Sequence, residues 1–167
     1  FDSKKVSRNK INFDISNIKY FIEPHIEQGP VLEKKKIPLG IVTGIRGSFR
    51  YRDAYCVGEY LHSGATPFEY RKDTVVAVSM LVNEMNILWQ KELKKNKDLV
   101  ITFGQFSTDH EQHSFAKSSG LVRFCIDVRS NSNKTLQLIN KRFFQQIKII
   151  EKKTKTKFFL GNQTNSE

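Results

Sequence analysis

The sequence predicts an α+β domain in which an antiparallel four-stranded sheet carries two helices on one face. Two long segments with apolar residues spaced by threes and fours indicate amphipathic helices. Shorter segments rich in β-branched and aromatic residues stand before, between and after them, as is typical of strands. The order from Phe49 onward is therefore β-α-β-β-α-β, which is the ferredoxin-like plan.

The first half of this unit is predicted from a strand-like segment and a helix, and another strand-like segment precedes it. Residues 38–47, "PLGIVTGIRG", and residues 48–62, "SFRYRDAYCVGEYLH", have the composition of strands, with glycines as bends. A helix is predicted from Arg71 to about Lys94, with Pro67 just ahead of it. Its apolar positions are Val75, Val78, Val82, Met85 and Trp89.

The second half of the unit is predicted from two strands, a helix and a last short strand. Residues 98–107 and 120–130 are predicted strands around a polar connection that contains histidines. A second amphipathic helix follows, and residues 157–162, "KFFLGN", are expected to form a last short strand. The helix is indicated by Leu136, Ile139, Phe143, Ile147 and Ile150. Residues 1–45 do not fit inside this unit, so the chain is divided into 1–45 and 46–167.

The chain is strongly basic, which raises the question of a nucleic-acid partner. It has 167 residues, 28 Lys and Arg against 17 Asp and Glu, and a formal net charge of +11. These charges gather at a terminus, a loop and two helix ends, where lysine complements the helix dipole without any partner. No zinc-finger, RRM or KH signature accompanies them, so nucleic acid is not favoured as a partner.

Other features indicate a cytoplasmic protein. No apolar run approaches the roughly 20 residues that span a bilayer, and the chain opens without a secretory signal pattern. Cys56 and Cys125 are isolated and lack CxxC spacing, so we expect two reduced thiols and no thiolate metal site.

Four short motifs contain residues that often carry chemistry: "PHIEQG", "HSGATP", "TDHEQH" and "DVRS". Each alone also has a structural interpretation. His25 is compatible with a satisfied histidine at the end of a buried strand, and the residues after His62 with a helix cap. His110 and His113 are compatible with solvated loop residues, and Arg129 with an ion pair on a strand face. Taken singly, the motifs predict no catalytic site.

In combination they resemble a known family. "FIEPHIEQGPVLEKKKIPLGIVTGIRG", then "GEYLHSGATPFEYRKDTVVA", a "TFGQF" strand and "FCIDVRS" are similar in order and spacing to the zinc-dependent amidohydrolases. This group includes N-carbamoyl-L-amino-acid hydrolases, allantoate amidohydrolases and β-ureidopropionases, within the aminoacylase and carboxypeptidase metallopeptidase superfamily. The resemblance covers about Tyr20 to Leu160.

The resemblance implies roles for three residues of the two motifs. His25 would be a ligand of one ion in a two-metal site. Strand geometry alone, not the resemblance, would place Glu27 on the same side as His25, where it could support that ligand. Gln28 would contact the substrate, where an amide can both donate and accept. His62 would reach from the lid of one subunit into the site of the other and stabilise the oxyanion of the tetrahedral intermediate.

Three further residues are implied to bind substrate. Arg129 matches the arginine that grips the substrate carboxylate with two parallel hydrogen bonds. Arg50 falls near a family arginine with a spacing that differs by one residue. His113 takes the place of an asparagine in the family segment that "HSFAKSSG" replaces, which leaves the substrate open among ureido and amide compounds.

The implied activity is metal-assisted hydrolysis of a linear C–N bond with two Zn²⁺ or Mn²⁺ ions. The family's H-x-D and Glu-Glu ligand residues lie upstream of this region and its last histidine ligand lies downstream, and no HxD occurs in this sequence. We therefore expect residues 1–45 to be a piece of the α/β metal-binding catalytic domain and residues 46–167 to be the lid, through which a homodimer forms. The chain alone would hold no complete metal site and would be inactive.

Two interpretations from other classes stay open. One is a stand-alone ferredoxin-like module that binds a small molecule or regulates another protein. The other is a basic nucleic-acid-binding domain, whose affinity would fall steeply with salt.

Overall fold

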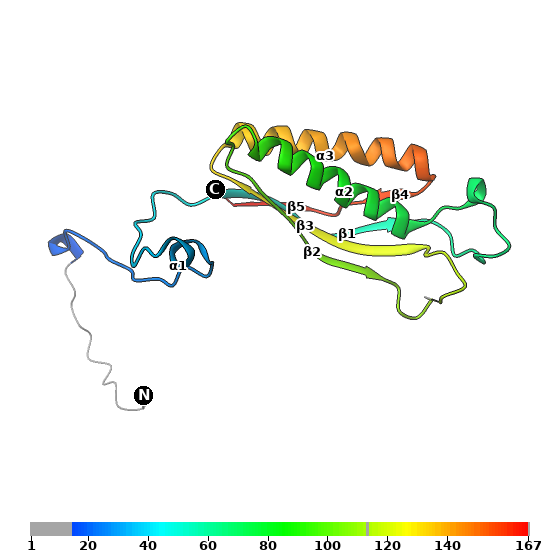
Figure 1. The fold of residues 1–167 in the computed structure, drawn as a ribbon, viewed down its shortest axis with the longest axis horizontal. Coiled ribbons are helices and arrows are strands. Elements are labelled where there is room, and N and C mark those ends of the chain that lie inside the picture. Colours follow the sequence, from blue (N-terminus) through cyan, green and yellow to red (C-terminus); the bar gives the residue numbers. More distant parts are fainter. Residues whose placement is uncertain (1–14, 113, 167) are drawn as a thin grey trace, which may run out of the picture. The chain divides into compact units, whose positions relative to one another are not determined.

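The computed structural model describes residues 15–112 and 114–166, which divide into two compact units (Figure 1). The boundary lies between Ile41 and Val42. The second unit contains the sheet and both long helices, and the first contains only short helical turns. Among the described residues, no helix is long and apolar enough to cross a membrane.

The second unit is built on one antiparallel sheet whose strands differ in length. Its central strands are β1 (Gly47–Val57) and β3 (Leu121–Ser130), which pair from end to end except for an irregularity in β1 between Tyr51 and Ala54. Strand β2 (Val100–Thr108) lies on the outer edge of β3. Strands β4 (Lys157–Phe159) and β5 (Gln163–Ser166) share the other edge of β1, one after the other. The α+β class with an antiparallel sheet is confirmed, with the order β2-β3-β1-β4 and one strand more than the predicted four.

Two helices cover one face of this sheet (Figure 1). Helix α2 (Thr74–Leu93) begins after Asp73, whose carboxylate accepts from the N–H groups of Val75 and Val76. Helix α3 (Asn133–Thr154) begins after Ser132, which caps it in the same manner. Both predicted helices are confirmed. Helix α3 begins before its first apolar position, Leu136, because Ser132 caps it there, and it continues past its last one, Ile150, to Thr154.

The core lies between the helices and the sheet. Alternate residues of β1 and β3 point into it because side chains alternate across a strand. The largest fully buried side chains include Phe124, Phe143, Leu81, Met85, Ile126 and Ile139. No helix of the second unit's described residues covers the opposite face of the sheet, which exposes polar and charged side chains of β1, β2 and β3.

Of the two strands predicted before the first long helix, one is absent and the other is shorter than predicted. Residues 38–46 form no strand, and β1 ends at Val57 rather than His62. After β1 the chain turns at Gly58, where an added Cβ would stand 1.9 Å from the carbonyl oxygen of Lys72. This close approach of two backbones takes residues 58–73 away from the sheet as a loop that contains the short helix η3 (Phe68–Tyr70).

The first unit has little secondary structure among its described residues. It contains the short helices η2 (Ile15–Asn17) and α1 (Val31–Lys35), with no strand between them. Its large apolar side chains are more than three-quarters exposed at Tyr20, Phe21, Ile22, Ile26, Leu39 and Ile41. Segments of this composition are ordinarily buried.

Candidate functional site

His62 lies in a turn after β1, and the backbone of that turn holds its imidazole. The Nδ1 atom accepts hydrogen bonds from the N–H groups of Gly64 and Ala65, each at 3.2 Å. A backbone N–H can only donate, so Nδ1 is unprotonated and the neutral ring carries its proton on Nε2. Because the side chain of His62 is exposed, its Nε2–H is available as a hydrogen-bond donor.

The segment around His62 pairs with the chain that follows the polar connection. The N–H of Ser118 donates to the carbonyl of Leu61 at 2.9 Å, and the N–H of Ser63 donates to the carbonyl of Ala116 at 2.8 Å. The structure therefore brings the "HSGATP" and "HSFAKSSG" segments together. The predicted substrate-binding residue His113 lies outside the described residues.

The predicted substrate-binding arginines lie on the helix-free face of the sheet, on either side of Asp127. Arg50 stands directly opposite Asp127 in the β1/β3 register, with its Nε 3.2 Å from Oδ1. Arg129 follows Asp127 by two residues, and its Nε and Nη2 donate to Oδ2 at 2.9 and 2.6 Å. The Arg129 side chain is about half exposed and the Arg50 side chain about one-quarter.

These contacts hold Asp127 as a carboxylate. Burial acts to raise its pKa, but the hydrogen bonds and charges of Arg129 and Arg50 together outweigh burial and keep the pKa below its ordinary value. The same hydrogen bond raises the pKa of Arg129. The site thus presents a half-exposed, oriented guanidinium, the group that binds carboxylates best.

His62 and Arg129 do not meet within one copy of the chain. Arg129 stands opposite Ser48 near the start of β1, whereas His62 follows the end of β1 at Val57. Nine residues of strand at about 3.3 Å per residue separate those ends by roughly 30 Å. One substrate of ordinary metabolite size cannot touch both side chains of the same copy.

The predicted metal ligand His25 lies in the first unit, in a segment that forms neither a helix nor a strand. Its Nδ1 is within hydrogen-bond distance of the carbonyl oxygen of Ile26. A carbonyl can only accept, so Nδ1 carries the proton and the lone pair of Nε2 is free, which is the form of imidazole that binds metal ions. Its side chain is exposed.

The neighbours of His25 differ in part from the predictions. Glu27 is not a partner of His25: its two carboxylate oxygens accept from the N–H groups of Val31 and Leu32, each at 3.0 Å, and so cap α1. Gln28 has a left-handed backbone with φ of 55° and an exposed side chain. The sequence did not indicate this cap because Glu27 precedes the helix by several residues.

The described residues alone do not complete a metal centre. No group of three or more His, Cys, Asp or Glu side chains in residues 15–112 and 114–166 lies close enough together to hold an ion. A zinc site needs three or more protein ligands, so any centre that uses His25 needs ligands from outside these residues. Cys56 is buried and Cys125 partly buried, both as free thiols, and burial raises the pKa of Cys56 to about 11.

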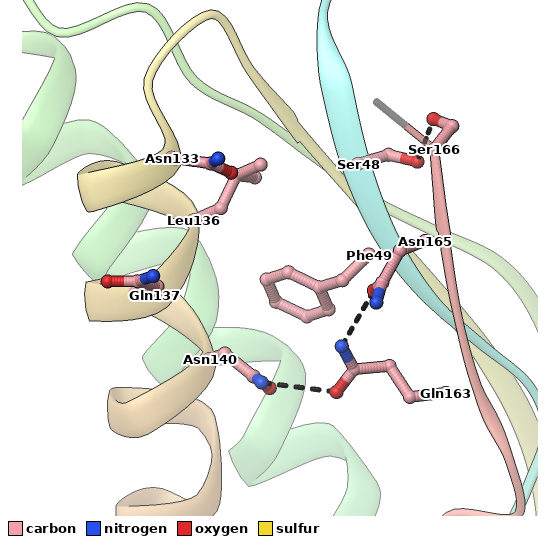
Figure 2. A pocket seen from close by; sticks show the side chains of 9 residues that line it. All are labelled: Ser48, Phe49, Asn133, Leu136, Gln137, Asn140, Gln163, Asn165 and Ser166. Atoms are coloured by element: carbon pink, nitrogen blue, oxygen red, sulfur yellow. Dashed lines mark hydrogen bonds between the residues drawn. The ribbon is translucent and has the colours of Figure 1, made fainter.

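A separate cleft of about 220 Å³ lies between α3 and β5 (Figure 2). Neutral amides line much of it and bond to one another: Asn140 donates to Gln163 at 3.2 Å, and Gln163 donates to Asn165 at 2.7 Å. Tyr51 adds a hydrogen bond to Gln163 at 2.6 Å. These bonds tie β5 to α3 and pair the amides of Asn140, Gln163 and Asn165 with one another.

The fold and these side chains together indicate the class of domain to which the second unit belongs. It is an α+β domain that offers a neutral histidine donor at one end of its sheet and an oriented arginine at the other. Such groups suit a small, polar, anionic ligand.

Comparison with known proteins identifies the family. The chain is 32% identical over 137 residues to the N-carbamoyl-L-amino-acid amidohydrolase of Pseudomonas sp. (strain NS671), a match that covers 82% of this chain and 32% of that protein. It is 37% identical over 113 residues to the allantoate amidohydrolase of Escherichia coli (strain K12), covering 68% of this chain and 26% of that one. A solved amidase of the hydantoinase/carbamoylase family from Burkholderia multivorans has a TM-score of 0.73 at 24% identity, covering 86% of this chain and 33% of that chain.

The chain therefore belongs to the family of N-carbamoyl-L-amino-acid and allantoate amidohydrolases. It spans about a third of the length of the relatives that it matches. A search against sequence models of known families finds no match. The relatives favour the amidohydrolase interpretation over a regulatory module or a nucleic-acid-binding domain.

Proposed function

We propose that this chain is part of a metal-dependent amidohydrolase that hydrolyses a linear C–N bond of an N-carbamoyl amino acid or a related ureido compound. The match to relatives named for N-carbamoyl-L-amino acids and allantoate carries this proposal. In it, residues 46–167 form a ferredoxin-like lid and dimerisation domain, and residues 1–45 are a piece of the catalytic domain. The complete protein would work in the cytoplasm.

The chain supplies substrate contacts from both units. Arg129, oriented by Asp127, would bind the substrate carboxylate, with Arg50 beside it. His113, which lies outside the described residues, is proposed as a further substrate contact. Gln28 would meet the ureido or amide group with its own amide. His62, with its proton on Nε2, would donate to the oxygen that becomes negative in the transition state.

The distance between His62 and Arg129 supports a site made from two copies of the chain. A separation of roughly 30 Å along β1 means that the two residues serve one substrate only when they come from different subunits. A symmetric homodimer through the lid would then contain two such sites, each with Arg129 of one subunit and His62 of the other.

His25 would contribute one metal ligand. Its free Nε2 lone pair and protonated Nδ1 suit a divalent ion such as Zn²⁺ or Mn²⁺. Two such ions, when bound, acidify water and polarise the substrate carbonyl. Because the other ligands would come from the rest of the protein, we expect this chain alone to be inactive.

The test uses the protein expressed from its complete reading frame. With N-carbamoyl-L-amino acids, N-carbamoyl-β-alanine and allantoate as substrates, at least one should be hydrolysed in the presence of Zn²⁺ or Mn²⁺. His25→Ala should lower the bound metal measured by mass spectrometry, while His62→Ala should lower turnover and leave metal content unchanged. Unchanged metal and turnover in His25→Ala would refute the ligand role.

A further inference from the structure

Arg71 holds the turn that carries His62. Its Nε donates to the carbonyl of Thr66 at 3.0 Å, and its Nη2 donates to the carbonyl of Ser63. These two carbonyls flank Gly64 and Ala65, whose N–H groups donate to the His62 ring. The guanidinium therefore closes the turn from both ends around the two amides that face the imidazole.

We call the two hydrogen bonds from the Arg71 side chain to the carbonyls of Ser63 and Thr66 the Arg71 clamp. The surroundings of Arg71 restrict the movement of this side chain. Its own N–H donates to the carbonyl of Phe68 in η3, and it stands two residues before Asp73, the cap of α2. The Arg71 side chain is partly buried. A planar guanidinium can donate to two carbonyls in a fixed geometry, which the single ammonium of lysine cannot reproduce.

The clamp matters because the two neutral tautomers of histidine have opposite chemistry at Nε2. With the proton on Nε2 the exposed edge of the ring donates, and with the proton on Nδ1 the same edge accepts. If the turn opened, the Gly64 and Ala65 amides would leave Nδ1, and that atom would be free to take the proton.

We propose that Arg71 is a positioning residue that keeps His62 in its Nε2–H form by closing the turn 62–66. This inference rests on the proposed function for its consequence in catalysis, but the tautomer itself can be observed in the present chain. A transition-state donor in the wrong tautomer contributes nothing, so Arg71 would affect turnover without touching substrate.

The direct test is nitrogen NMR of the 167-residue chain, in the alkaline range where the ring nitrogen shifts of His62 no longer change with pH. His62 is assigned with His62→Gln. The unmodified chain should show an unprotonated Nδ1 and a protonated Nε2 for His62. In Arg71→Lys and Arg71→Met, the two nitrogen shifts should move toward each other as both tautomers become populated.

Arg142→Lys is the matched control. Arg142 lies on α3 and bonds to Gln145 at 3.1 Å, away from the turn, so its loss should leave the His62 shifts unchanged. Unaltered methyl shifts of the core residue Val78 show that a variant is folded. Should the Arg71 variants fail to fold, slow exchange of the Arg71 Nε–H in the unmodified chain tests the clamp without substitution.

Each outcome decides the proposal. A protonated Nδ1 in the unmodified chain, fast exchange of the Arg71 Nε–H, or an unchanged tautomer in folded Arg71→Lys would overturn it. In the protein from the complete reading frame, Arg71→Lys should lower kcat by about 10- to 100-fold with little change in KM. If that protein hydrolyses none of the substrates, the proposed function fails, while the tautomer result stands or falls by itself.

Discussion

His25 and His62 are held in opposite tautomers because different backbone groups face their Nδ1 atoms. A carbonyl faces Nδ1 of His25 and two N–H groups face Nδ1 of His62. The first arrangement leaves a lone pair for a metal ion, and the second leaves a proton for a developing oxyanion. The two residues are therefore proposed to have different roles, which the metal and turnover measurements on His25→Ala and His62→Ala test.

Asp127 is the residue whose charge is most tightly linked to the arginine pair. Since its pKa is lowered in the folded chain, its stabilising effect is present above the ordinary aspartate pKa and is lost as pH falls through the folded value. We expect Asp127→Asn to lower the free energy of unfolding at pH 7 by about 1 kcal/mol, since the carboxylate is partly exposed. Urea unfolding at pH 7 and at pH 3 measures this, and the difference should shrink at pH 3.

Asp53→Asn serves as the control, because Asp53 is exposed in the irregular part of β1 and should change stability little. A loss in Asp127→Asn that is equal at both pH values would contradict the charge-based explanation.

The residues predicted from motifs and those found only in the structure differ in kind. His25, His62 and Arg129 belong to short local patterns, so the sequence indicates them. Asp127 appears beside Arg129 in "DVRS", but its second contact, with Arg50, comes from a strand about 80 positions earlier. The Arg71 side chain donates to backbone carbonyls, and because every residue has a carbonyl, no sequence pattern indicates which ones it binds. Cross-strand and side-chain-to-backbone bonds are fixed only by the folded chain.

At the scale of elements, β1 organises the second unit. It pairs with β3 on one edge and with β4 and β5 on the other, and its inward side chains meet α3. The ring of Tyr51 in β1 stacks on that of Phe143, with 5.7 Å between the ring centroids. It packs edge-to-face against the ring of Phe144, with 6.1 Å between the centroids. The strand and the helix thus share one aromatic cluster.

The two phenylalanines provide a matched pair. Phe143 is fully buried and Phe144 is 41% exposed, although both contact Tyr51. We expect Phe143→Ala to lower the free energy of unfolding by about 4 kcal/mol, because it leaves a cavity, and Phe144→Ala by about 1 kcal/mol. Denaturant unfolding of the chain measures both values. Equal losses would contradict the difference in burial between Phe143 and Phe144.

The elements that the sequence predicts well have a strong local period. Both long helices have apolar residues every three or four positions and a capping side chain. Strand β5, "QTNS", has no apolar alternation and exists because β1 offers it an edge, so it was not predicted. Residues 38–46 show the opposite case: their β-branched content suits a strand, but no strand of the described chain pairs with them.

At the scale of the whole molecule, the two units differ in how much apolar surface each buries within itself. The second unit has a buried core, whereas the described part of the first unit, from residue 15 onward, exposes most of its large apolar side chains. We expect limited proteolysis of the chain to cut first within residues 18–46 and to leave a resistant product that begins near Gly47. Mass spectrometry of the products locates the cuts, and early cleavage inside α2 or α3 would contradict this division.

The separation of His62 from Arg129 leads to a prediction about the assembled protein. If each site takes Arg129 from one subunit and His62 from the other, then His62→Ala and Arg129→Ala are each poorly active alone. Mixing and re-equilibrating the two variants should restore activity, because half of the dimers become mixed and each mixed dimer has one intact site.

The recovered turnover should approach about a quarter of the unmodified value. The control is the pair His62→Ala and Arg71→Ala, which alter the same turn. Both substitutions act on the histidine that each subunit gives to its partner, so each site of a mixed dimer is still defective and mixing should recover nothing. The same lack of recovery for His62→Ala with Arg129→Ala, in samples shown to exchange subunits, would place both residues in one subunit's site and contradict the composite arrangement.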